Sequence, residues 1–173
     1  LRINNIAPVN TTAQPTVQLD VDNVSGGAGD ATPFQFNIRH SYGATELLIR
    51  NTSANGQPDV QLNGVIDNQL GSTLIASVSG SIVAYSANAL VRSNTADLSA
   101  GGSIGDAARR LELELVQSEG RDAFLTSSSG ADTWLGIRGL VRDPAAAAFT
   151  LSLGDQSAGG RLDLLLREAK RQV

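Results

Sequence analysis

One short phrase occurs twice in this chain at a fixed distance. Residues 79–82 read Ser-Gly-Ser-Ile and residues 102–104 read Gly-Ser-Ile, so that Ile82 and Ile104 stand 22 positions apart (104 − 82). A fixed period in the low twenties is typical of a solenoid, in which each repeat is one coil stacked on the last. The same bend then returns in every coil, which predicts that Ile82 and Ile104 lie on neighbouring parallel strands.

Short alternating segments fill most of the remaining sequence and predict many strands. Aromatic residues make up only 4% of the chain and glycine accounts for 18 of 173 residues, so the core must consist of small aliphatic side chains between many tight turns. No long helical pattern separates the strands, which argues against βαβ units. The clearest predicted strands are Thr16–Val24, Phe34–Arg39, Glu46–Arg50, Leu111–Val116, Thr133–Leu140 and Arg161–Leu166.

These features predict an all-β protein, either a parallel β-helix or an antiparallel β-sandwich. The recurring phrase favours the β-helix, because a sandwich has no reason to repeat a phrase at one period. A uniform coil of 22 residues divides the 173 residues into about eight coils. We expect a β-rich segment at 1–58 that caps the solenoid or forms its first coils, solenoid repeats at 59–166 and a C-terminal tail at 167–173.

The composition argues against several classes of function. The chain has no cysteine, which removes disulfides, zinc–thiolate sites and cysteine nucleophiles. Its net charge of −4 and its scattered arginines are not typical of a nucleic-acid binder. No run approaches the ~18 apolar residues of a membrane-spanning helix. We therefore expect no nucleic-acid partner, no membrane span, no cofactor and no metal.

A family resemblance is carried by DNQLGST at residues 67–73, SGSI at 79–82 and LSAGGSIG at 98–105. In this order they resemble the repeats of very large bacterial exoproteins of the filamentous-haemagglutinin type. The resemblance covers about residues 60–166 and implies that family's fold, a right-handed parallel β-helix. The Asn-Pro-Asn-Gly type signature of the family's secretion domain is absent, so the resemblance implies a segment of the shaft.

The resemblance implies a structural or adhesive segment of a secreted protein, located outside the cell or on the bacterial surface, and not an enzyme. Its partners would be other coils of the same polypeptide, together with surface glycans or with receptors on host or neighbouring cells. The chain, which contains no methionine, would be an excised piece or a processed product of a longer protein. Open solenoid ends would also make end-to-end self-association possible.

A carbohydrate-binding module is the first alternative. Trp134 and Tyr85 would stack on sugar rings if their own rings are exposed. Asp20 and Asp22 alternate along one face of a predicted strand and are further candidate ligand contacts. Carboxylates spaced in this way are also usual on any solvated strand face, so these two positions carry the weaker argument.

A β-helical enzyme that acts on polysaccharides is the second alternative. It would use Glu112 together with acidic and basic residues of adjacent coils, which are Glu114, Asp97, Asp106, Arg109 and Arg110. Alternation of Glu with Leu is the ordinary pattern of a half-exposed strand, however. A single histidine, His40, does not by itself make a catalytic triad. The sequence therefore predicts no catalytic residue.

Overall fold

The computed structural model describes residues 1–7, 18–22, 34–41, 44–53, 58–158 and 160–172. All elements in these residues are β-strands, thirteen in number, and they form one hydrogen-bonded system. The ends of the predicted strand Thr16–Val24 lie outside the described residues. The strands are β1 Arg2–Ala7, β2 Gln18–Asp22, β3 Phe34–Ser41, β4 Ala44–Asn51, β5 Val60–Leu62, β6 Val65–Ser77, β7 Ile82–Ala84, β8 Leu90–Ala100, β9 Leu111–Gln117, β10 Ala123–Ser129, β11 Thr133–Val141, β12 Leu151–Asp155 and β13 Leu162–Arg171.

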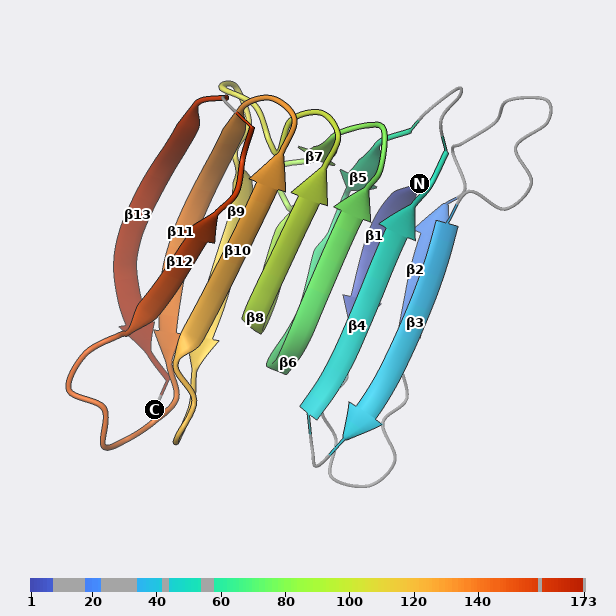
Figure 1. The fold of residues 1–173 in the computed structure, drawn as a ribbon. Helices are drawn as coiled ribbons and strands as arrows, with labels where there is room; N and C mark the ends of the chain where they lie inside the picture. The colour runs from blue at the N-terminus through green and yellow to red at the C-terminus, as the bar shows by residue number, and fades with distance from the viewer. Residues whose placement is uncertain (8–17, 23–33, 42–43, 54–57, 159, 173) are drawn as a thin grey trace.

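The strands stack in two long parallel ladders, one in front of the other in Figure 1. The first ladder contains β4, the second halves of β6 and β8, and then β10 and β12. The second ladder contains β1, the first halves of β6 and β8, and then β9, β11 and β13. Because β6 and β8 each contribute to both ladders, the chain winds as a coil. A third row, which includes β5 and β7, completes each turn.

Ile82 and Ile104 are neighbours in the third row, as the repeat predicted. They form a parallel bridge, in which the Ile82 nitrogen donates to the Ser103 oxygen at 2.9 Å and the Gly105 nitrogen donates to the Ile82 oxygen at 2.8 Å. The protein is therefore a β-solenoid. The alternative of an antiparallel β-sandwich is wrong, because the ladders that build the body are parallel.

The expectation of about eight coils is wrong, and the chain makes about five turns. Steps of 22 residues from Val60 to Ile82 to Ile104 give way to steps of 29 from Ile104 to Thr133 to Leu162 (133 − 104 and 162 − 133). Part of the extra length lies at the corner between the ladders. There β8 bends directly, whereas residues 118–122 separate β9 from β10 and residues 142–150 separate β11 from β12.

Both ends of the chain take part in the stack. Within residues 1–58, β1 and β4 pair in parallel with strands of the solenoid, while β2 and β3 pair antiparallel with β1 and β4. At the other end, β13 pairs with β11 and continues to Arg171. Strand structure thus extends through most of residues 167–173.

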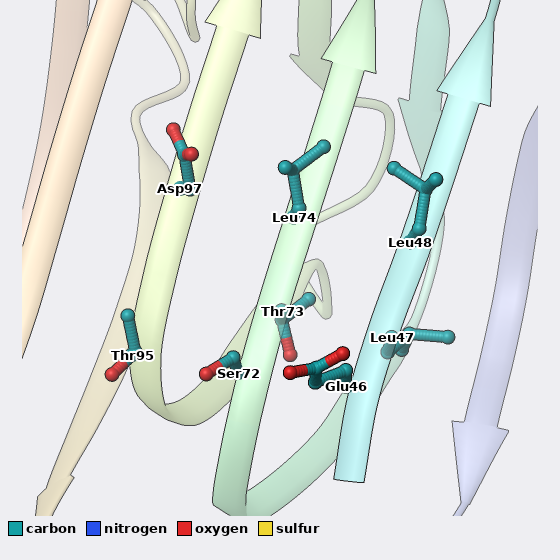
Figure 2. A pocket seen from close by; sticks show the side chains of 8 residues that line it. All are labelled: Glu46, Leu47, Leu48, Ser72, Thr73, Leu74, Thr95 and Asp97. Carbon is teal, nitrogen blue, oxygen red and sulfur yellow. The ribbon is translucent and has the colours of Figure 1, made fainter. Parts of the chain in front are cut away.

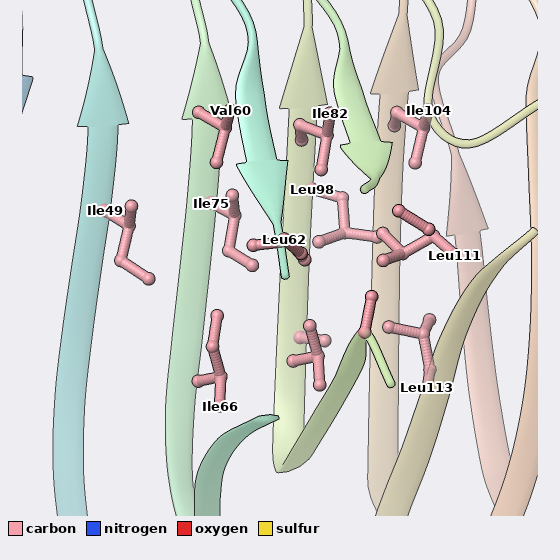
Figure 3. Packing of buried hydrophobic residues seen from close by; sticks show 14 of the residues in the cluster. Ile49, Val60, Leu62, Ile66, Ile75, Ile82, Leu98, Ile104, Leu111 and Leu113 are labelled. Carbon is pink, nitrogen blue, oxygen red and sulfur yellow. The ribbon is translucent and has the colours of Figure 1, made fainter. Parts of the chain in front are cut away.

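Aliphatic side chains fill the space between the ladders (Figure 3). Ile49, Ile75 and Leu98 occupy the same position on successive strands of the first ladder, and all three are fully buried. Leu113 belongs to the opposite ladder and to the same cluster. Burial of a side chain of this size contributes about 1.5–3 kcal/mol relative to its exposure. Stacked rows of such residues are consequently the main source of the fold's stability.

Glycines allow successive coils to approach closely at the corner that follows the first ladder. The Gly101 nitrogen donates to the Ser77 oxygen and the Gly130 nitrogen to the Ala100 oxygen, at 2.8 and 3.0 Å. A β-carbon at Gly101 would lie 2.4 Å from the Val78 oxygen, and one at Gly130 would lie 2.1 Å from the Gly101 oxygen. Both distances are far inside van der Waals contact, so this corner requires residues without a side chain.

A row of ion pairs crosses the outer face of the second ladder. The Nη1 atom of Arg92 is 3.2 Å from Asp67 Oδ2, and its Nε atom is 2.5 Å from Glu114 Oε1. Burial alone would lower the pKa of Arg92, but hydrogen bonds and charge attraction from Glu114 and Asp67 outweigh it and raise this pKa. Glu114, one of the candidate enzyme residues, is thus held by Arg92.

Candidate functional site

Trp134 lies in β11, and its ring is covered in part by arginines. The Cζ atom of Arg161 is 4.6 Å from the ring centroid, and that of Arg110 is 5.5 Å from it. Guanidinium groups at these distances are attracted to the face of an indole ring. A sugar that stacked on Trp134 would therefore compete with these arginines for the ring.

Tyr85 directly follows β7 and is the more accessible of the two candidate aromatic residues. Its relative exposure is 47%, and the Cζ atom of Arg2 lies 3.9 Å from its ring centroid. Arg2 therefore stacks on the ring while almost half of the residue stays in contact with solvent. The backbones of Asp20 and Asp22 lie in β2, paired with β1, and their side chains lie outside what the structure describes.

The structure does not bring Asp97 and Glu112 together. Asp97 lies in the second half of β8, where its neighbours are Leu74 and Thr126 of the first ladder. Glu112 lies in β9 of the second ladder, and its carboxylate forms a two-pronged pair with Arg167 at 3.0 and 2.7 Å. These two carboxylates belong to different ladders and do not form one site.

Arg109, Arg110 and Glu112 do come together. They line a polar hollow of about 370 Å³, which we call the arginine hollow. It is formed by the turns that precede β8 and β9, by Glu112 at the start of β9 and by Arg167 of β13. Its full set of lining residues is Ser86, Ala87, Ala89, Ala107, Ala108, Arg109, Arg110, Glu112 and Arg167.

Hydrogen bonds fix the turn and the side chains of this hollow. Asp106 Oδ1 accepts from the backbone nitrogens of Ala108 and Arg109, at 2.8 and 2.7 Å. Arg110 Nη2 is 2.5 Å from Asp163 Oδ1. The hydrogen bond from Arg110 is the main cause that holds the pKa of Asp163 below its ordinary value; burial opposes it, and Arg161 adds a further hydrogen bond that lowers this pKa. Asp106 is therefore a structural acceptor, and Arg110 is partly neutralised.

A second hollow lies on the first ladder (Figure 2). Its volume is about 360 Å³, and we call it the sheet hollow. Leucines from β4 and β6 give it an apolar part, and Asp97 lies at one side of it in Figure 2. Its lining residues are Glu46, Leu47, Leu48, Ser72, Thr73, Leu74, Thr95 and Asp97. The hollow therefore combines apolar side chains with two acidic residues, Glu46 and Asp97.

We expect Asp97→Asn to raise the free energy of unfolding at pH 7. Burial raises the pKa of Asp97 above its ordinary value, so the native protein holds this proton more tightly than the unfolded chain. The ionised carboxylate then costs stability as the pH rises from the unfolded-state pKa of about 4 through the higher folded-state value. Urea unfolding of both proteins should show a difference at pH 7 that disappears at pH 3.5.

Glu119→Gln is the control for this prediction, because Glu119 is exposed on the turn after β9. It should leave the stability unchanged at both pH values. A loss of stability in Asp97→Asn at pH 7 would contradict the prediction, since it would mean that a partner in the native state stabilises the carboxylate.

Arg167 is the site residue that the sequence did not point to. It lies 55 positions from Glu112 and reaches it across β11, where a β-carbon at Gly136 would be 2.5 Å from the Glu112 carboxylate. Gly136 therefore leaves the space through which Glu112 and Arg167 meet. In the sequence, the signal for this contact is Gly136, which stands between the hydrophobic residues Leu135 and Ile137 of β11.

No group of three or more His, Asp or Glu residues in the described part of the chain is arranged to hold a metal ion. The same residues include no helix long and apolar enough to cross a membrane. Comparison with protein-family models, curated protein sequences and solved structures found no match to this chain. The class of protein is thus defined by its fold, a β-solenoid.

Proposed function

We propose that this chain is a structural segment of a larger solenoid, a stiff shaft on whose C-terminal end further coils stack. The proposal includes an adhesive role in a secreted bacterial surface protein, and it assigns no catalytic activity. The resemblance of residues 60–166 to exoprotein repeats supports the location and the role. The exposed leucines and unpaired strand edges of the last coil support the stacking of further coils.

The last coil leaves uncovered the positions that every earlier coil buries. Leu153 aligns with Leu125, and its exposure is 40% where that of Leu125 is 1%. Leu166 aligns with Ile137, and its exposure is 68% where that of Ile137 is 2%. Within the described residues β12 pairs only with β10 and β13 only with β11, so each has an unpaired edge. This end therefore has both the apolar surface and the hydrogen-bonding groups that a further coil would use.

Stacking on this end would repeat the interactions that build the body. Each new coil would extend both ladders and cover the exposed leucines, which favours continuation over an exposed end. At ~4.8 Å per coil, the five turns of this segment span roughly 24 Å of shaft. Such a shaft keeps a fixed length and direction without moving parts, as the presentation of a distant binding region requires.

Insertion of one coil between β12 and β13 tests whether β12 accepts a further strand on its open edge. Duplication of residues 131–159 inserts 29 residues, which matches the 29-residue step between Thr133 and Leu162. If the proposal holds, the longer protein will be fully folded and its urea m-value will rise with the added buried surface. The matched control carries Leu135→Asp and Ile137→Asp in the added copy only, and it should leave that copy unfolded.

An added coil that is cleaved by protease, with an m-value equal to that of the original chain, would show that the last coil is a cap and would overturn the proposal.

Antibody labelling of intact cells of the source organism tests the surface location. A glycan array separates the shaft from the carbohydrate-binding alternative, in which binding would be lost in Tyr85→Ala. The enzyme alternative requires turnover of a uronic-acid polymer that is lost in Glu112→Gln.

A further inference from the structure

The arginine hollow stands out because it gathers positive charge on an acidic protein. The chain carries a net charge of −4, yet three of the nine residues that line this hollow are arginines and one is a glutamate. Asp106 lies in the adjoining turn, and Asp163 is shared between Arg110 and Arg161. These groups leave the hollow with a small excess of positive charge.

Arg109 is held in place by hydrogen bonds that use only some of its N–H donors. Its Nη1 atom donates to the Ala84 oxygen at 3.2 Å and also to the Tyr85 oxygen. A guanidinium group has five N–H donors, and within the described residues Arg109 makes no hydrogen bond through its Nε or Nη2 atoms. A side chain that is anchored on one side and open on the other loses little conformational entropy when it binds a ligand.

The chemistry of the hollow suits a carboxylate. Arg167 already holds the Glu112 carboxylate in a fork at 3.0 and 2.7 Å, and this is the geometry that guanidinium and carboxylate groups prefer. The carboxylates of Glu112 and Asp106 would repel a doubly charged phosphate more strongly than a singly charged ligand. The volume of about 370 Å³ and the four alanines of the wall leave room for an uncharged body beside the charged group.

We infer that the arginine hollow is a binding site for a monoanionic carboxylate on a compact polar body, with Arg109 as its principal contact. In this site the outer edge of the Arg109 guanidinium donates to the carboxylate of the ligand. The Glu112–Arg167 pair forms the opposite wall and limits the charge of the ligand to about one. The inference does not depend on the proposed shaft function, because the hollow lies on the side of the solenoid and is complete within the described residues.

Titration of the 173-residue protein with sodium glucuronate, followed by backbone NMR, tests the site. Glucose serves as the uncharged counterpart of the probe, and inorganic phosphate as the more highly charged anion. We expect glucuronate to shift signals of residues 86–89 and 107–112, glucose to shift none, and phosphate to bind more weakly. Arg109→Gln should weaken glucuronate binding about tenfold or more, the typical effect of losing a charge-assisted hydrogen bond.

Two further variants separate this site from general charge attraction. Arg121→Gln is the matched control, because Arg121 is also exposed and anchored through Nη1, here to the Leu70 oxygen at 3.0 Å. It should leave glucuronate binding unchanged. Ala108→Glu adds a carboxylate to the hollow without removing any side-chain hydrogen bond, and it should abolish binding while the NMR spectrum shows an intact fold.

Three outcomes would overturn the inference. They are the absence of any glucuronate binding to the folded protein, equal loss of affinity in Arg109→Gln and Arg121→Gln, and binding of phosphate at least as tight as that of glucuronate. The last two would show that the excess positive charge attracts anions without a formed carboxylate site.

Discussion

Gly130→Ala should lower the free energy of unfolding by about 3 kcal/mol, at the upper end of the usual cost of overpacking. The new β-carbon would lie 2.1 Å from the Gly101 oxygen. The atom that it meets belongs to the backbone of the coil below, which cannot move aside as a flexible side chain can. The Gly130–Ala100 hydrogen bond must then lengthen, and the ladders on both sides of the corner must separate. Urea unfolding monitored by circular dichroism measures the effect.

Gly154→Ala provides the control, because a β-carbon at Gly154 has nothing within 4 Å. It should change the free energy of unfolding by no more than about 0.5 kcal/mol, as is usual for surface substitutions. If both variants lose the same stability, the cost comes from glycine itself and not from the close approach of the coils at Gly130.

Leu98→Ala should cost about 3 kcal/mol or more, because it removes a fully buried side chain from the middle of the interior rows. Leu98 aligns with Ile75 on one neighbouring strand and with Ser127 on the other. The paired backbones on both sides keep the cavity from collapsing, which places the loss in the upper part of the usual range for leucine. Thermal and urea unfolding should agree on the size of the loss.

Val78→Ala is the comparison for this prediction, since Val78 is an aliphatic residue with 47% exposure. Its loss should be well under 1 kcal/mol. A loss below about 1 kcal/mol in Leu98→Ala would contradict the prediction and would mean that the interior repacks around the missing side chain.

The sequence was informative about the fold wherever structure repeats. The 22-residue spacing of Ile82 and Ile104 predicted their parallel pairing, and the alternation in Leu111–Val116 predicted β9. A repeat at one spacing does not indicate where that spacing changes, so the sequence did not predict the 29-residue steps. Those steps include irregular residues at a corner, as in residues 118–122, and such residues carry no pattern. Alternation also shows which residues share a face but not the direction of a strand, so the antiparallel pairing of β2 and β3 was not predicted.

The candidate site was less predictable, because it depends on which residues meet across coils. Arg167 and Glu112 meet although 55 positions separate them, and that meeting depends on the length of two irregular coils. The arginines beside Trp134 come from different coils for the same reason, with Arg161 preceding β13. Arg109 and Arg110 could be named in advance only because they lie within a few positions of Glu112.

The later coils have longer corners, and at these corners the length of the chain can vary. Residues 118–122 and 142–150 lie between strands of the two ladders, yet the strands on either side of them remain paired with their neighbours. Residues can therefore be inserted at this corner without shifting any strand against its neighbour. One edge of the solenoid is then free to vary in sequence and length from coil to coil, while the two ladders preserve the spacing. A β-solenoid of this kind is suited to displaying a row of variable loops at intervals of about 4.8 Å.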